Sequence, residues 1–92
     1  MKYDYVIEGM DLVIEYDDKK VSERGKGAAE KTAAIIAIRE MAGMNRKEFA
    51  EWLKIPYRTM SDWEHGLREM PDYVLHLIAY KVRMEIVEKR RD

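Results

Sequence analysis

The segment from residue 45 to residue 66 constrains the fold more than any other part of the chain. It reads NRKEFAEWLKIPYRTMSDWEHG and contains two runs with helical spacing, separated by little more than Lys54-Ile55-Pro56. The residue before a proline disfavours the helical region, so the first run must end there. Because proline is tolerated in the first turn of a helix, the second run can begin at Pro56 or Tyr57. We therefore expect two short helices with an abrupt bend between them.

Residues near its ends delimit the first of these helices. Asn45 is followed three residues later by Glu48, which is a variant of the capping box: Asn accepts from unpaired backbone amides and Glu reaches back. This pattern predicts a helix over residues 45–53. Its inward side chains are expected to be Phe49, Ala50 and Leu53.

The second short helix is predicted over residues 56–65. Met60 and Trp63 are expected to face inward, and Gly66 suits the end of the helix. Earlier in the chain, residues 28–42 favour helix. There the apolar stripe consists of Ile35, Ile38 and Ala42, and it is followed by Gly43.

The last segment predicts a helix over residues 71–89, opened by Pro71 and Asp72. Apolar residues lie around most of the circumference of this predicted helix. One side carries Val74, Leu75, Ile78 and Val82, and another carries Leu77, Tyr80, Met84 and Val87. One side can dock on the other helices, whereas the rest requires a second partner.

The N-terminal residues have a different character. Leu12, Ile14 and Tyr16 alternate with other residues, and we predict two short strands that turn near Glu8-Gly9. A lone two-stranded hairpin is marginal in water, so it must pack on the helices or pair with a second chain as a dimerisation arm. The chain thus divides into an N-terminal β arm and linker, residues 1–27, and a helical domain, residues 28–92.

Composition limits the classes of protein to consider. Ninety-two residues without a cysteine make one small domain with no disulfide framework or thiolate site, so the cytoplasm is the expected location. No apolar run reaches the length needed to cross a membrane, and no signal-peptide pattern is present. Seventeen basic and eighteen acidic residues give a net charge of -1, so any nucleic-acid binding must come from local placement of charge.

The chain offers little support for catalysis. His65 and His76 lie far apart in the sequence without cysteines, and no serine, histidine and acid are grouped as a charge-relay arrangement requires. We expect no enzymatic activity, no metal and no cofactor.

Residues 38–78, IREMAGMNRKEFAEWLKIPYRTMSDWEHGLREMPDYVLHLI, resemble the lambda-repressor and Cro-type, or Xre-family, helix-turn-helix DNA-binding domains. The chain departs from the family pattern at Lys54, where a glycine is usual, and at Pro56, where a Ser or Thr cap is usual. Residues 1–30 lie outside the resemblance. The matching residues are Arg39, Gly43, Met44, Ala50, Met60, Trp63, Glu64 and Gly66.

The resemblance implies a mainly α helix-turn-helix bundle, here with a small N-terminal β-hairpin and a long C-terminal helix. It implies that the helix over 56–65 enters the DNA major groove. Arg39 and Glu64 match a structural pair that bridges the first and third helices. The residues implied to contact bases are Tyr57, Arg58, Ser61 and Asp62, and those implied to contact the DNA backbone are Arg46, Thr59 and Arg68.

Three of the four base-contacting candidates also have a plainer interpretation. Arg58 can donate two hydrogen bonds to guanine, or it is a solvated surface arginine. Asp62 can accept from cytosine or orient a neighbouring arginine, or it contacts nothing. Tyr57 reaches a thymine methyl or a phosphate, or it covers the turn. The terminal Lys89-Arg90-Arg91 cluster touches phosphate or is a solvated end.

From these features we expect a sequence-specific, double-stranded DNA-binding regulator that acts as a homodimeric transcriptional repressor. The alternative is an antitoxin-like or adaptor module, in which the N-terminal arm and the last helix hold another protein such as a toxin. The sequence does not decide between the arm and the last helix as the dimer interface.

Overall fold

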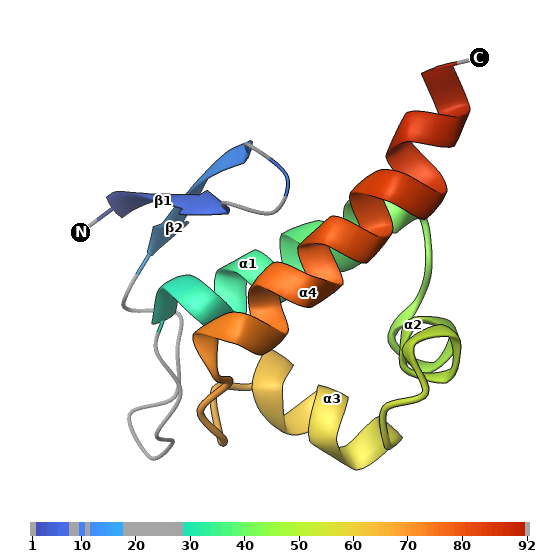
Figure 1. The fold of residues 1–92 in the computed structure, drawn as a ribbon. Coiled ribbons are helices and arrows are strands. Elements are labelled where there is room, and N and C mark those ends of the chain that lie inside the picture. Colours follow the sequence, from blue (N-terminus) through green and yellow to red (C-terminus); the bar gives the residue numbers. More distant parts are fainter. Residues whose placement is uncertain (1, 8–9, 11, 18–28, 92) are drawn as a thin grey trace.

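The computed structural model describes residues 2–7, 10, 12–17 and 29–91, and the helix α1 (Ala29–Ala42) lies at the centre of the arrangement. This helix contacts the N-terminal hairpin, α3 and α4 (Figure 1). The elements are β1 (Lys2–Ile7), β2 (Leu12–Asp17), α1 (Ala29–Ala42), α2 (Arg46–Leu53), α3 (Tyr57–Glu64), α4 (Asp72–Val82), the π-helical segment η3 (Arg83–Val87) and the 3-10 segment η4 (Glu88–Arg91). The chain is mainly helical with one small antiparallel sheet, as expected from the sequence.

The predicted apolar stripe of α1 forms the centre of the core. Ile35 and Ile38 are fully buried and Ala42 is 4% exposed. Gly43 adopts a φ of 74°, a left-handed conformation that glycine takes without steric cost, and the helix ends there. Residue 28, the predicted start of the helix, lies outside the described residues.

The two N-terminal strands form the predicted hairpin, which packs on α1. The strands are antiparallel, with Ile7 opposite Leu12 and Val6 opposite Val13. Ile7 is fully buried in the core, whereas Val6 and Val13 on the other face are 54% and 57% exposed. The hairpin is therefore an integral part of the monomer's core. Its predicted turn at Glu8-Gly9 and the connection over 18–28 lie outside the described residues.

The capping box forms at the start of α2 as predicted. The Glu48 amide donates to Asn45 Oδ1 over 2.8 Å, and the Asn45 amide donates to Glu48 Oε1 over 3.1 Å. Asn45 itself is the cap, so the helix begins at Arg46. Phe49 and Ala50 are buried, and Leu53 is only partly buried against the core.

A left-handed residue and a proline separate α2 from α3. Lys54 caps α2 with φ 59° and ψ 39°, and Pro56 precedes α3 without a side-chain cap. Met60 and Trp63 face the core, as predicted. The Gly66 φ of 70° then turns the chain away from the helix.

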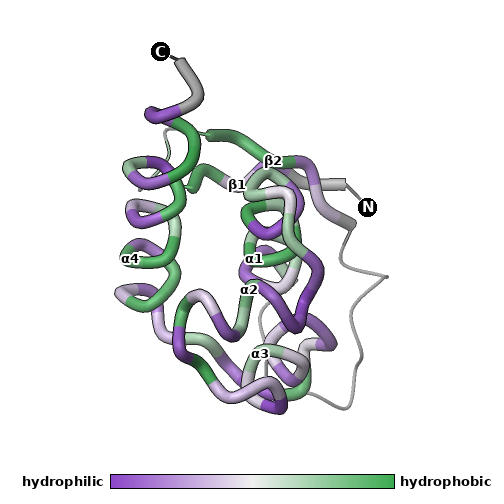
Figure 2. The backbone as a smooth tube through the Cα atoms, turned by 90° about the vertical axis from the view of Figure 1, so that its right-hand side faces the viewer, coloured by the Kyte–Doolittle hydropathy of each residue, from purple (hydrophilic) through white to green (hydrophobic). Residues whose placement is uncertain are grey.

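The last helix differs from the single α-helix predicted over 71–89. It begins at Asp72 after the cap Pro71, and the α-helical part ends at Val82, where the π-helical segment follows. Because a π-turn pairs residues five apart, Val87 returns to the side of Val82 and packs against the core. This differs from the prediction, which placed Val87 on a different side of the helix from Val82. Figure 2 shows apolar residues recurring along the length of α4.

Candidate nucleic-acid interface

The helix α3 lies at the end of the molecule away from the hairpin and the C-terminus (Figure 1). Its inward side chains Met60, Trp63 and Glu64 are all buried. The opposite side of the helix carries Arg58, which is exposed, and Tyr57 in the first turn is exposed as well. A short helix with one anchored side and one open side can present its outer residues to a partner.

An ion-pair cluster fixes α3 to its neighbours. Arg39 Nε of α1 donates to both carboxylate oxygens of Glu64, over 3.2 and 3.0 Å, and Arg39 Nη1 donates to the Met44 carbonyl over 3.1 Å. The Glu64 side chain is completely buried, whereas that of Arg39 is 18% exposed. Removing one member of such a buried pair costs more free energy than the pair contributes. The structure thus brings together the two residues that the resemblance implied as a structural pair.

Arg46 joins the same cluster, which sequence reasoning did not anticipate. Its Nε lies 3.3 Å from Glu64 Oε1, and its side chain is 29% exposed. Burial acts to lower the pKa of the Arg46 guanidinium, but the hydrogen bond with Tyr57 and the charge of Glu64 outweigh it and raise this pKa above its ordinary value. Arg46 therefore links the start of α2 to α3. No local sequence signal indicates a contact between residues this far apart.

Arg58 is the exposed cation of the outward side. It lies in the first turn of α3, beside Tyr57, which is 51% exposed. Within the described part of the chain, Arg58 forms no ion pair. Its guanidinium can therefore bind an external acceptor without first breaking an internal contact.

The other two base-contacting candidates already have partners inside the chain. Ser61 Oγ lies 3.3 Å from His65 Nδ1, and the same nitrogen lies 2.7 Å from the Ser61 carbonyl oxygen. Asp62 Oδ2 lies 3.9 Å from Arg68 Nη2, and the Asp62 side chain is only 22% exposed. Asp62 is thus placed to orient Arg68, one of the roles considered for it.

The two remaining backbone-contacting candidates, Thr59 and Arg68, differ in position and exposure. Thr59 is half-buried in the middle of the helix. Arg68 follows α3 and its side chain is 59% exposed. Of the three residues implied to contact the DNA backbone, Arg68 is the most accessible cation, because Arg46 is partly enclosed beside Glu64.

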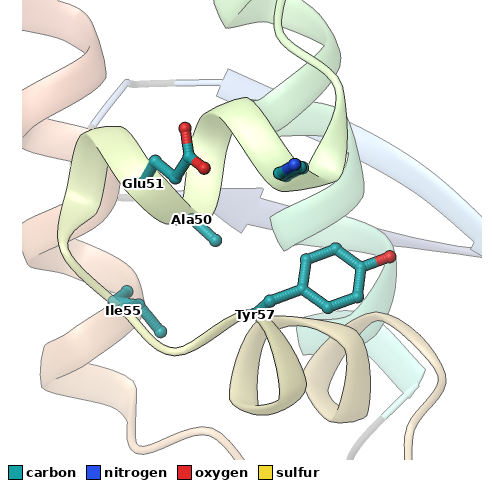
Figure 3. Close-up of a pocket in the computed structure, with 5 residues that line it drawn as sticks. Ala50, Glu51, Ile55 and Tyr57 are labelled. Atoms are coloured by element: carbon teal, nitrogen blue, oxygen red, sulfur yellow. The ribbon is translucent and has the colours of Figure 1, made fainter.

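A cleft of about 310 Å³ lies between α2 and the start of α3. Figure 3 shows Ala50 and the turn residue Ile55 bordering this space, with the Tyr57 ring on its α3 side. Lys47 and Glu51 complete the lining. Sequence reasoning missed this cleft, because the lining residues come from two helices whose mutual placement depends on the turn at Lys54.

Two other kinds of site find no counterpart in the described ranges. Residues 2–7, 10, 12–17 and 29–91 contain no group of three His, Cys, Asp or Glu side chains placed to hold a metal ion. Within the same ranges, every helix is too short or too polar to cross a lipid bilayer. Comparisons with protein-family models, curated proteins and solved structures found no match.

Proposed function

We propose that this chain binds double-stranded DNA sequence-specifically through α3, and that it acts as a homodimeric transcriptional repressor of the helix-turn-helix type. The observation that carries the proposal is Arg58, an exposed guanidinium without an ion pair in the described part of the chain, on the open side of an anchored helix. An α-helix fits the major groove of B-DNA, and a guanidinium there can donate two hydrogen bonds to guanine O6 and N7.

The charge of the chain makes the proposal depend on individual basic side chains. The whole chain has a net charge of -1, so non-specific attraction to DNA is weak. The segment from α2 to the loop after α3, residues 46–71, carries five acidic and five basic side chains, so attraction to DNA depends on where the basic ones lie. The exposed ones are Lys47, Lys54, Arg58 and Arg68. The Asp62 carboxylate lies 3.9 Å from Arg68 Nη2, so Arg68 partly offsets its charge.

The anchoring of α3 is also suited to base recognition. Discrimination between base pairs requires that donor atoms be held in a fixed position relative to the DNA. Here the Arg39–Glu64–Arg46 cluster and the capping box restrain both helices on either side of the turn. The free-energy cost of ordering α2 and α3 is therefore met when the chain folds and not when it binds DNA.

The first experiment is selection of bound duplexes from a random DNA pool. We expect an enriched inverted repeat, because a two-fold symmetric protein places two equal helices in successive major grooves about one helical turn apart. Binding to the selected duplex should weaken steeply with salt, since basic side chains release counterions from phosphates. A pool without any enriched sequence contradicts the proposal.

Substitutions at Arg58 test the residue on which the proposed DNA binding depends. Arg58→Ala should cost roughly 1–3 kcal/mol on the selected duplex and relax the preference for guanine at one position of each half-site. Arg58→Lys is the matched control, because it keeps the charge but loses the planar fork. We expect the lysine variant to retain the salt dependence while losing the guanine preference. Unchanged specificity in both variants contradicts base recognition by Arg58.

A second candidate function is the protein-interaction module, antitoxin-like or adaptor-like. It is favoured by Val6 and Val13, an apolar cross-strand pair that is more than half exposed on the hairpin. Replacing both valines by threonine keeps the β-branched shape but adds polar groups. Loss of a co-purifying partner by this variant, with DNA selection unchanged from that of the wild type, would establish the two activities as separate.

A further inference from the structure

Four large side chains form an exposed stripe on the last helix. They follow one another at intervals of four, three and four positions, which places them on one side of a helix. Their exposed fractions decrease from 68% to 45% along the helix. We call this set the α4 stripe; it consists of Tyr73, Leu77 and Tyr80 of α4 and Met84 of the adjoining segment η3.

We propose that the α4 stripe is the homodimer interface, and that its occupant is the α4 stripe of a second copy in antiparallel orientation. The inference rests on the proposed function only in one respect, the expectation that the protein acts as a dimer. Its tests measure association without DNA, so the interface and the DNA-binding function can fail separately.

The spacing of the stripe supports a self-complementary contact. Its intervals read the same in both directions, so a two-fold axis between residues 78 and 79 superposes the stripe on itself. Around that axis, Tyr73 lies opposite Met84 of the second copy and Leu77 lies opposite Tyr80 of the second copy. Each aromatic ring then meets an aliphatic or thioether side chain, which avoids ring crowding and allows sulfur–aromatic contact. A two-fold interface requires this kind of reciprocal pairing.

The size of the stripe fits a small dimer interface. A large side chain covers about 200 Å² when fully exposed, so the observed exposures leave roughly 450 Å² of apolar surface. Homodimer interfaces are about 65% apolar, which scales this area to roughly 700 Å² per protomer. A stable interface of standard size buries about 800 Å² per protomer. The exposed valine pair of the hairpin, Val6 and Val13, has much less exposed apolar area.

Charges beside the stripe do not oppose the approach of an identical surface. Lys81 Nζ lies 2.6 Å from Glu85 Oε2, and Arg83 Nε lies 3.4 Å from Glu88 Oε1. Each of these basic side chains is therefore balanced within its own chain. On the proposed axis Glu85 lies opposite Asp72 of the second copy, and each of these carboxylates is paired with a lysine of its own chain, Lys81 and Lys31 respectively. Lys81 also lies 4.8 Å from the Trp52 ring centroid, which holds its stem toward α2.

The first test measures oligomeric state by sedimentation equilibrium over a range of protein concentrations. We expect a wild-type dimer and at least a 30-fold larger dissociation constant for Leu77→Glu, the size expected for a central interface residue. The matched control is Leu67→Glu, which makes the same change at a leucine that is 52% exposed in the loop after α3. A monomeric wild type overturns the proposal, as does a Leu77→Glu variant that associates like the wild type.

Val13→Glu tests the competing interface. If the hairpin mediates association, this variant becomes monomeric while Leu77→Glu remains dimeric, which overturns the proposal. Circular dichroism of each variant establishes that it is folded. A variant that does not fold is replaced by the milder Leu77→Gln and Val13→Gln changes, to which the same criteria apply.

The second test determines the orientation. The natural chain has no cysteine, so a single introduced cysteine is the only reactive thiol. In the antiparallel pair, two copies of residue 77 are offset by about 4.5 Å along the helices and two copies of residue 73 by about 16 Å. A short bifunctional thiol reagent should therefore crosslink Leu77→Cys but not Tyr73→Cys. Crosslinking of both variants, or of Tyr73→Cys alone, overturns the antiparallel arrangement.

Discussion

Lys54 determines the sharpness of the bend between α2 and α3. Its φ of 59° and ψ of 39° lie in the left-handed helical region, where a residue with a Cβ is disfavoured by about 1–2 kcal/mol. Hydrogen bonds hold it there, since its amide donates to the Glu51 carbonyl over 3.1 Å and the Ile55 amide donates to the Ala50 carbonyl over 2.9 Å. The chain therefore keeps the turn despite the conformational cost at this lysine.

Lys54→Gly should stabilise the protein. Glycine has no Cβ and adopts the left-handed conformation without this cost, although its larger unfolded-state entropy offsets part of the gain. We expect the free energy of unfolding to rise by about 0.5–1 kcal/mol. Lys54→Ala is the matched control, because it removes the same charge and keeps a Cβ. Urea denaturation of both variants measures the difference, and equal stabilities would contradict strain at this position.

Local contacts of single residues were predictable, and distant ones were not. The Asn45–Glu48 capping box joins residues three apart, so the motif itself predicts its geometry. The Arg39–Glu64 pair joins residues 25 positions apart and was expected only through the resemblance. The participation of Arg46 had no sequence signal, because it depends on how α2 and α3 meet.

At the scale of elements, Lys31 connects the start of α1 to the loop before α4. Its Nζ donates to the Met70 carbonyl over 2.8 Å, lies 2.8 Å from Asp72 Oδ1 and lies 4.0 Å from Glu69 Oε1. The hydrogen bond with Asp72 raises the pKa of Lys31 against the opposing effect of burial. The same hydrogen bond lowers the pKa of Asp72.

These pKa shifts predict how the connection responds to pH. The lowered Asp72 pKa means that its contribution to stability is present above the ordinary aspartate pKa, near 4, and is lost as the pH falls through the lowered value. The raised Lys31 pKa means that its contribution is present below the ordinary lysine pKa and is lost as the pH rises through the raised value. The connection should therefore be intact at neutral pH.

Asp72→Asn tests this prediction. The variant should be less stable than the wild type at neutral pH. The difference should shrink as the pH falls from about 4 through the lowered Asp72 pKa, because the wild-type carboxyl becomes neutral over that range. Urea denaturation at a series of pH values measures the difference. Glu69→Gln is the control and should show a smaller effect, since its carboxylate is farther from Lys31. A difference independent of pH would assign the Asp72 effect to something other than its charge.

In the last helix, the apolar sequence pattern predicts which sides are buried and exposed, but it does not predict the π-turn. Its apolar residues on two sides predicted a buried side and an exposed side, and the structure has both. The change to a π-turn at Arg83 was not predictable, because Ile86 and Val87 are both apolar and either can follow Val82 on the core side. With the wider turn both Ile86 and Val87 pack against the core, and the local sequence does not indicate that packing.

At the scale of the whole molecule, the hairpin should contribute to the stability of the monomer. Ile7→Ala should lower the free energy of unfolding by about 2–4 kcal/mol, because Ile7 is fully buried and its removal leaves a cavity. The neighbouring Val6→Ala is the control and should change it by at most about 0.5 kcal/mol, since Val6 is 54% exposed. Thermal and urea denaturation measure both. Similar small effects would show that the hairpin detaches readily from α1.

The arrangement of the two surfaces predicts how dimerisation and DNA binding depend on each other. Arg58 lies on α3, and the α4 stripe lies on a different helix, so a dimer formed through the stripe leaves both copies of Arg58 exposed. Linking two copies makes the second half-site contact effectively intramolecular, which raises affinity without any new contact to DNA.

Leu77→Glu should therefore separate recognition from avidity. On the selected inverted repeat, we expect this variant to bind with the affinity of a single half-site and with about half the wild-type slope of log affinity against log salt concentration, because half as many phosphates are contacted in each binding event. Its preference for the half-site sequence should persist, since Arg58 is unchanged. Val13→Glu adds the same charge at another exposed position and should keep the wild-type slope. Fluorescence anisotropy at several salt concentrations measures both slopes, and a wild-type slope for Leu77→Glu would mean that the two half-sites are joined by a surface other than the α4 stripe.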